Sequence, residues 1–186
     1  IPPNVKFYVD DIESDWVPGR PYDYIHGRYL ACAIKDWPKL VRQSYTHLKG
    51  GGWVEFQDYD LRAYSEDGSL KPDNALLKFH DHIGEAADEM GRTARPGPQL
   101  RKWVEEAGFV NVQERVFQLP IGPWAKDAKF KKAGGLHMLQ FLNGLEAFTV
   151  AMYTHHLGWS MEQIQLFLVD VRKDAKLKNV HALNNL

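Results

Sequence analysis

Polar and titratable side chains follow two strand-like segments near the start of the chain. Asp10 and Asp11 come after the apolar run 5–9, and His26 and Arg28 follow the run 22–25. If both runs are parallel strands of one sheet, these groups lie at its carboxyl-terminal edge, where open α/β sheets bind ligands. The alternative is that the aspartates are a solvated strand end, that His26 is a packed or turn histidine, and that Arg28 is a surface charge.

Three other clusters match chemical motifs only in part. The glycines 50–52 precede a strand and lack G-x-G-x-x-G spacing, so we interpret them as a helix stop and turn. His80 and His82 point in different directions on a helix and Cys32 is isolated, which predicts no metal site. Ser160 lacks the final glycine of a hydrolase elbow and is better explained as a helix cap.

The hydrophobic pattern alternates between strand and helix in the first two-thirds of the chain. Strands are predicted at 5–9, 22–25, 53–56 and, from the alternation of Val110, Val112 and Val116, at 110–116. Helices are predicted from Trp37 to Leu48 (with Asp36 as cap), at 74–90 and at 100–107. This order predicts an α/β domain with parallel strands.

The tail is predicted to be mainly helical. An apolar stripe from Met138 to Met152 indicates a long helix that stops near Gly158, and Ser160 with Gln163 forms a capping-box pattern for the next helix. We interpret 1–186 as one partial domain. Residues 1–117 form its strand-and-helix core, and residues 118–180 form a helical lid or substrate region.

Charge and composition exclude several classes of protein. The net charge is -1, with 23 basic and 24 acidic residues, so no general phosphate-binding surface is expected and nucleic acid is not an expected partner. No apolar run approaches membrane-spanning length. The single cysteine, Cys32, excludes an internal disulfide and favours a reducing compartment, the cytoplasm or nucleus.

Eight segments form an ordered set of landmarks along the chain: 11–13 (DIE), 22–28 (YDYIHGR), the Trp37 helix, 51–55 (GGWVE), 107–112 (AGFVNV), 120–124 (PIGPW), 144–147 (GLEA) and 157–160 (LGWS). Their order resembles the class I S-adenosylmethionine (SAM)-dependent methyltransferases, and the later motifs resemble the fungal LaeA-like members of that family. The similarity covers nearly the whole chain.

The resemblance implies a Rossmann-like sheet with helices on both faces, and SAM as cofactor across the carboxyl ends of its strands. By resemblance, the Asp11 carboxylate accepts a hydrogen bond from the adenine amino group, and the Ile12 backbone reaches the ring nitrogen. His26, Gly27 and Arg28 are expected beside the methionine part of the cofactor, with Gly27 permitting close backbone approach.

The methyl acceptor is expected to be a small metabolite or a protein side chain. A general base is needed only if the acceptor arrives protonated, and His26 or Tyr29 could provide it. By resemblance, Tyr29, Trp124 and Trp159 are candidates for acceptor binding. No catalytic residue is assigned from the sequence.

The strands predicted here correspond, by resemblance, to strands three, four, five and six of the family order three, two, one, four, five, seven, six. Strands one and two, the glycine-rich cofactor loop and the acidic residue after strand two are not found. Strand seven also looks absent, with His181 to Leu186 as its approach. We therefore expect an incomplete domain that binds SAM poorly by itself.

Two other functions remain open at this stage. One is a non-catalytic, methyltransferase-like scaffold that acts through a regulatory protein partner. The other is a Rossmann-like nucleotide-binding domain of another kind, such as a reductase, although its C-terminal motifs do not resemble one.

Overall fold

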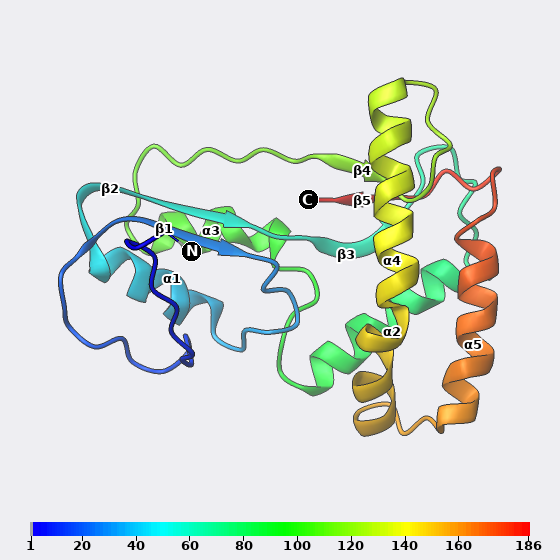
Figure 1. Ribbon diagram of the computed structural model, residues 1–186, viewed down its shortest axis with the longest axis horizontal. Coiled ribbons are helices and arrows are strands. Elements are labelled where there is room, and N and C mark those ends of the chain that lie inside the picture. Colours follow the sequence, from blue (N-terminus) through cyan, green and yellow to red (C-terminus); the bar gives the residue numbers. More distant parts are fainter. Residues whose placement is uncertain (1) are drawn as a thin grey trace.

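The computed structural model describes residues 2–186 and has two parts (Figure 1). One part holds the parallel pair β1 and β2 with helices α1 and α3; the other holds three long helices and a small antiparallel sheet. The strands are β1 (Tyr22–Arg28), β2 (Leu48–Gln57), β3 (Asp60–Tyr64), β4 (Gln118–Pro120) and β5 (Leu183–Asn185). The helices are α1 (Trp37–His47), α2 (Ala75–Glu89), α3 (Gly97–Glu106), α4 (Ala128–His155) and α5 (Met161–Asp174).

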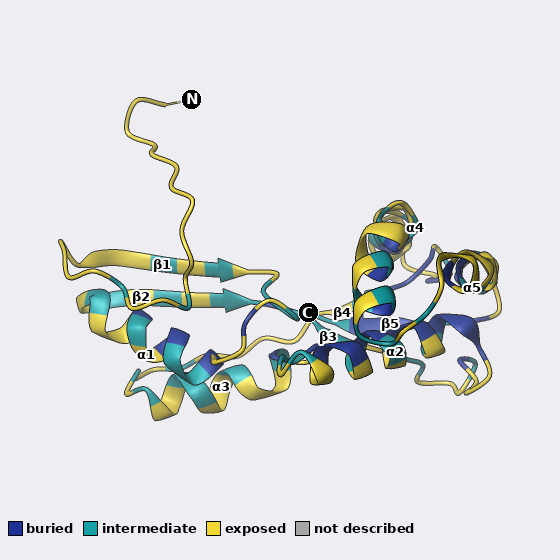
Figure 2. Ribbon diagram, turned by 90° about the horizontal axis from the view of Figure 1, so that it is seen from below, coloured by how far each residue is buried: buried dark blue, intermediate teal, exposed yellow. Residues whose placement is uncertain are grey.

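The parallel pair has one covered face and one open face. Ile25 pairs with Val54 and Gly27 with Phe56, and this side packs on α1 and α3 (Figure 2). The alternate positions face the other way, in the pairs Tyr24–Trp53, His26–Glu55 and Arg28–Gln57. Trp53 is 64% exposed there. The open face therefore carries polar and aromatic side chains rather than core residues.

Helix α1 covers one face of the parallel sheet. Its first turn is fixed by capping residues, and its apolar face packs on the sheet. The Asp36 carboxylate accepts from the Lys39 backbone N–H at 2.7 Å, and Pro38 occupies the first turn, as predicted. Trp37 is buried and lies edge-on to Phe56 and parallel to Trp103 of α3, with ring centroids 5.9 and 5.7 Å apart. These aromatic contacts join the sheet to both helices.

The second sheet has the order β3–β5–β4 with antiparallel neighbours. Asp60 and Gln118 both pair with Asn185, and Tyr64 and Pro120 both pair with Leu183. β5 thus lies between β3, which follows the predicted strand 53–56, and β4, which follows the predicted strand 110–116. The expectation that strand seven is absent was therefore wrong, because the segment from His181 supplies it.

Helices α2, α4 and α5 pack around an apolar core. Its fully buried members are Ala87, Leu145, Tyr153, Ile164, Leu168 and Val171. The predicted capping box is confirmed: the Ser160 N–H donates to the Gln163 side chain at 2.8 Å, and the Gln163 N–H donates to Ser160 Oγ at 3.2 Å. Within the described residues, none of the helices is apolar over enough of its length to cross a bilayer.

Three predictions about single segments were wrong. Residues 5–9 form no strand: Phe7, Tyr8 and Val9 are 77%, 80% and 107% exposed. Residues 110–116 also lack pairing, and the strand begins only at Gln118, opposite β5. β propensity does not make a strand without a neighbour to pair with.

The third correction concerns the glycines 50–52. Helix α1 already ends at His47, with Leu48 extended, so the glycines do not stop it. They lie within β2, where Gly51 has a φ of 81°. They do not form a strand-to-helix phosphate loop.

Replacing Gly27 with alanine is expected to destabilise the parallel pair. An added Cβ would lie 2.9 Å from Phe56 Cδ1, and that ring is held by Trp37. Overpacking of this kind costs about 1–3 kcal/mol of unfolding free energy. Urea denaturation followed by circular dichroism measures it, with Gly84→Ala as control, since a Cβ at Gly84 meets nothing within 4 Å. Equal stability of wild type and Gly27→Ala would contradict the packing argument.

Acid should destabilise the helical part through His80. This side chain is buried, its Nδ1 donates to the Leu76 carbonyl at 2.8 Å, and burial lowers its pKa to about 4. The unfolded chain therefore binds a proton below its own pKa of about 6.5, while the folded protein does not until about pH 4. The resulting stability is present above about pH 6.5 and is lost as the pH falls toward 4, by about 1.4 kcal/mol per unit.

The measurement is the free energy of unfolding of wild type and His80→Gln at pH 7, 6 and 5. The variant should show the smaller loss. His155→Gln, at an exposed position near the end of α4, should keep the wild-type dependence. Parallel curves for wild type and His80→Gln would refute the assignment.

Candidate functional site at the carboxyl ends of β1 and β2

A hydrogen-bonded cluster occupies the open face of the parallel pair. Tyr24 Oη donates to Glu55 Oε2, and His26 Nδ1 lies 2.9 Å from the same oxygen. The Tyr24 and His26 rings stack with centroids 6.1 Å apart. The Tyr24 hydrogen bond, with a smaller contribution from His26, lowers the pKa of Glu55, and the same carboxylate raises the pKa of Tyr24. A carboxylate is therefore held ionised on an exposed surface.

The chain turns sharply where β1 ends. Tyr29 has a φ of 56°, a left-handed conformation that is unusual for an aromatic residue and costs about 1–3 kcal/mol. Its N–H donates to the Gln57 carbonyl at 3.1 Å. Arg28 donates from Nη2 to the Tyr29 hydroxyl at 2.7 Å, and its guanidinium carbon lies 4.3 Å from the centre of that ring. Strain of this kind is often found at functional sites.

A buried carboxylate holds this turn in place. Asp58, at the end of β2, accepts hydrogen bonds from the backbone N–H groups of Leu30, Ala31 and Tyr59, the last two at 3.2 and 2.8 Å. Burial raises the pKa of Asp58, while the three N–H donors act in the opposite direction. The single side chain thus connects the loop after β1 to the end of β2.

An aromatic column leads from this turn to helix α4. The rings of Tyr29 and Tyr59 are nearly parallel with centroids 5.3 Å apart, and those of Tyr59 and His137 are nearly parallel at 6.1 Å. Burial and the neighbouring Tyr29 raise the pKa of Tyr59. Burial lowers the pKa of His137, whose Nδ1 lies 2.9 Å from the Pro120 carbonyl oxygen. Side chains from β1, the β2–β3 turn and α4 therefore meet here.

The predicted residues Asp11 and Ile12 lie in a turn beside α1. The Asp11 carboxylate accepts from the Glu13 N–H at 2.9 Å and from Ser14 Oγ at 3.2 Å. The Ile12 carbonyl accepts from the Trp16 indole at 3.0 Å. Glu13 then accepts from the backbone N–H groups of Lys35 and Asp36. The turn is therefore tied to the start of α1, and the hydrogen bonds of the described residues do not join it to residues 26–28.

The predicted residues 26–28 lie together at the end of β1, but on two faces. His26 and Arg28 share the open face, whereas Gly27 faces Phe56 and the helices. Gly27 can therefore contribute only backbone atoms to a ligand on the open face.

The structure does not bring the two predicted tryptophans together. Trp124 precedes α4 and donates its indole N–H to the Ala182 carbonyl at 3.2 Å, whereas Trp159 follows α4 and packs on Tyr153 and Phe167. A helix of 28 residues separates them, which is about 42 Å at 1.5 Å per residue. They do not line one pocket.

Four side chains of this site were not predicted from the sequence: Glu55, Asp58, Tyr59 and His137. Asp58 and Tyr59 follow a predicted strand directly, so their position after β2 is a signal that could have been used. His137 lies in an apolar stripe with no such signal. Among residues 2–186 no group of three or more acidic, histidine and cysteine side chains is placed to hold a metal ion.

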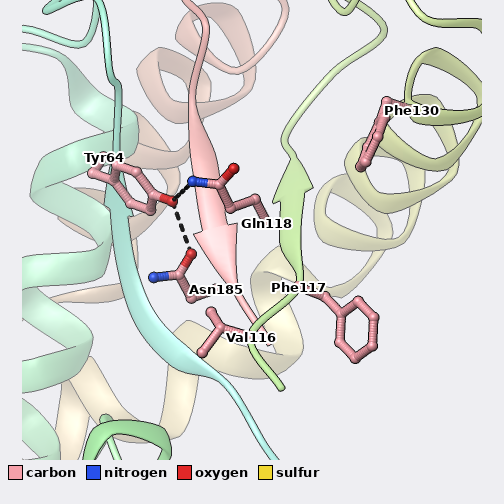
Figure 3. A pocket seen from close by; sticks show the side chains of 6 residues that line it. All are labelled: Tyr64, Val116, Phe117, Gln118, Phe130 and Asn185. Atoms are coloured by element: carbon pink, nitrogen blue, oxygen red, sulfur yellow. Dashed lines mark hydrogen bonds between the residues drawn. The ribbon is translucent and has the colours of Figure 1, made fainter. Parts of the chain in front are cut away.

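A separate hollow of about 470 Å³ lies over the antiparallel sheet (Figure 3). Tyr64 Oη donates to Asn185 Oδ1 at 2.8 Å and accepts from Gln118 Nε2 at 3.0 Å, while Val116, Phe117 and Phe130 supply apolar walls. None of these residues belongs to the site at β1 and β2.

Comparison with known proteins identifies the class. Residues 1–114 match the model of a methyltransferase domain family, and the chain belongs to that family. The resemblance to the fungal LaeA-like branch is also confirmed by the relatives that follow. The chain is 44% identical over 182 residues to "Methyltransferase pytC" of Aspergillus terreus, covering 98% of this chain and 56% of that protein.

Two further relatives are similar over the whole chain. "Secondary metabolism regulator LAE1" of Cochliobolus heterostrophus is 33% identical, covering 100% of this chain and 62% of that protein. "Protein-methionine methyltransferase laeA" of Emericella nidulans is 30% identical, covering 100% of this chain and 50% of that protein. The chain spans about half the length of the curated relatives that it matches.

Proposed function

We propose that the protein is a SAM-dependent methyltransferase whose cofactor and acceptor meet at the carboxyl ends of β1 and β2. The observation that carries the proposal is the strained turn at Tyr29, held by Asp58 at the sheet edge where α/β folds bind ligands. Membership of the methyltransferase domain family gives that turn its chemical context.

The residues at this edge fit such a cofactor. Arg28 offers a cation for a carboxylate, and the exposed Asp11 carboxylate keeps acceptor capacity beyond its two local hydrogen bonds. Ile12 and Gly27 would contribute backbone atoms, and His26 with Glu55 would border the open face. SAM supplies an activated methyl group with an excellent leaving group, so the protein needs chiefly to position the acceptor and exclude water.

Calorimetric titration with S-adenosylhomocysteine (SAH) tests the proposal on the protein made from its complete reading frame, with this chain measured in parallel. Arg28→Gln should weaken binding by about tenfold, the effect of losing about 1.4 kcal/mol. Arg101→Gln, at an exposed position on α3 where the arginine forms an ion pair with Glu105, should bind as wild type does. If the complete protein binds no SAH, the enzymatic proposal fails.

The second candidate is a non-catalytic, methyltransferase-like scaffold with a protein partner. Its support is on α4, where Leu136 and Leu139 lie one turn apart and are each more than half exposed, and where Glu146 is the only acidic or basic residue, histidine aside, between 133 and 154. Exposed apolar side chains grouped on one helix face are found at protein contacts. If the wild-type protein binds SAH and Arg28→Gln weakens that binding, the result favours the enzyme over the scaffold.

A further inference from the structure

His137 differs from His26, the histidine on the open face of the parallel pair, in the partner of its Nδ1 atom. Nδ1 lies 2.9 Å from the Pro120 carbonyl oxygen. A carbonyl oxygen only accepts, so Nδ1 must carry the proton in that hydrogen bond. In the neutral ring Nε2 is then unprotonated and has a free lone pair.

The surroundings of His137 favour the neutral ring. Burial lowers its pKa, and the groups that face it are the Tyr59 phenol from the β2–β3 turn and His80 from α2, neither of which is an anion at neutral pH. His26 contrasts with it, because its Nδ1 lies beside the Glu55 carboxylate. His137 can therefore accept a proton from the acceptor at Nε2. His26 is less suited to this role, because its ring is already paired with a carboxylate.

The aromatic column places His137 in line with the end of β1. Arg28, Tyr29, Tyr59 and His137 follow one another with successive distances of 4.3, 5.3 and 6.1 Å. The column therefore brings three stacked rings together, with two phenol hydroxyls and one imidazole. A planar aromatic molecule with its own hydroxyl matches both the apolar and the hydrogen-bonding groups of these side chains.

We propose that His137 is the general base of the acceptor site and that the acceptor is an aromatic compound bearing a hydroxyl group. This rests on the proposed function, which supplies the methyl donor. The acceptor O–H proton passes to His137 Nε2 as the oxygen lone pair forms a bond to the methyl carbon. The carbon–sulfur bond of the donor breaks, and its electron pair stays on sulfur, giving the neutral thioether. Methylation of a thioether, such as a methionine side chain, needs no base because the sulfur carries no proton. A general base at His137 therefore distinguishes the proposed reaction from methionine methylation.

Three measurements test the proposal, and the first two do not depend on turnover. The first is NMR of ¹⁵N-histidine-labelled protein at pH 7, in which the His137 signals are assigned by their absence from the His137→Gln spectrum. The His137 ring should be neutral, with its proton on Nδ1. An Nε2–H tautomer would overturn the proposal. The second probe is para-nitrophenol, whose phenolate has its own absorption band. Wild type should bind it, with or without SAH, with a phenolate-to-phenol ratio at least about tenfold above that of the His137→Gln complex.

The third measurement is methyl transfer to hydroxylated aromatic probes, which His137→Gln should slow by about 100-fold or more while SAH affinity stays unchanged. His155→Gln, on the same helix, is the matched control. Equal phenolate in wild type and His137→Gln overturns the base, and absence of phenol binding to a protein that binds SAH overturns the acceptor class. If the wild-type protein does not bind SAH, the cofactor proposal is wrong instead. The tautomer and phenolate results then still decide the role of His137.

Discussion

Replacing Trp37 with alanine is expected to lower the free energy of unfolding by about 3–5 kcal/mol. The side chain is 2% exposed and lies between Phe56 of β2 and Trp103 of α3. Its removal leaves a cavity in the aromatic cluster where the parallel sheet, α1 and α3 meet. Chemical denaturation followed by circular dichroism measures the loss.

Trp37→Phe is the informative companion. The indole Nε1 is buried with no hydrogen-bond partner, so phenylalanine removes an unsatisfied N–H along with part of the ring. We expect this variant to lose about 1 kcal/mol, well below the alanine variant, because the ring still packs on Phe56 and Trp103. A phenylalanine variant as unstable as the alanine variant would show that the indole itself, not the filled volume, is what α1 requires.

The sequence predicted those helices whose first residues are fixed by capping side chains close to them in the chain. Asp36 with Pro38 begins α1, and Ser160 with Gln163 begins α5, as expected. The segments 5–9 and 110–116 have strand-like side chains but no neighbouring strand, and pairing is a non-local property. The three-residue strand β5 was missed for the opposite reason: its neighbours β3 and β4 define it, not its own residues.

The candidate site divides in the same way. His26 and Arg28 could be found because they follow a strand that was predicted, and the structure places them on one face. His137 could not, because it joins the aromatic column through the packing of α4 against Pro120 and Tyr59, which is a tertiary contact. Trp124 and Trp159 looked like partners by residue type, and the length of α4 separates them.

Replacing Asp58 with alanine is expected to cost about 3 kcal/mol of unfolding free energy and to release the turn after β1. The change leaves the N–H groups of Leu30, Ala31 and Tyr59 without their acceptor, and each buried donor left unsatisfied costs about 1–3 kcal/mol, less where water enters. The left-handed conformation of Tyr29 has then lost its anchor, so the residue should relax to a negative φ. Hydrogen exchange of the amides at 29–31 reports the release directly.

Two variants separate charge from anchoring. Asp58→Asn keeps one acceptor oxygen but turns an amide NH₂ toward backbone donors, so it should fall between wild type and alanine. Tyr29→Gly removes the cost of the left-handed backbone while leaving Asp58 in place, so its turn should stay protected from exchange. If Asp58→Ala keeps both wild-type stability and slow exchange at 29–31, the turn is held by its own backbone, and Asp58 is not what positions the aromatic column toward α4.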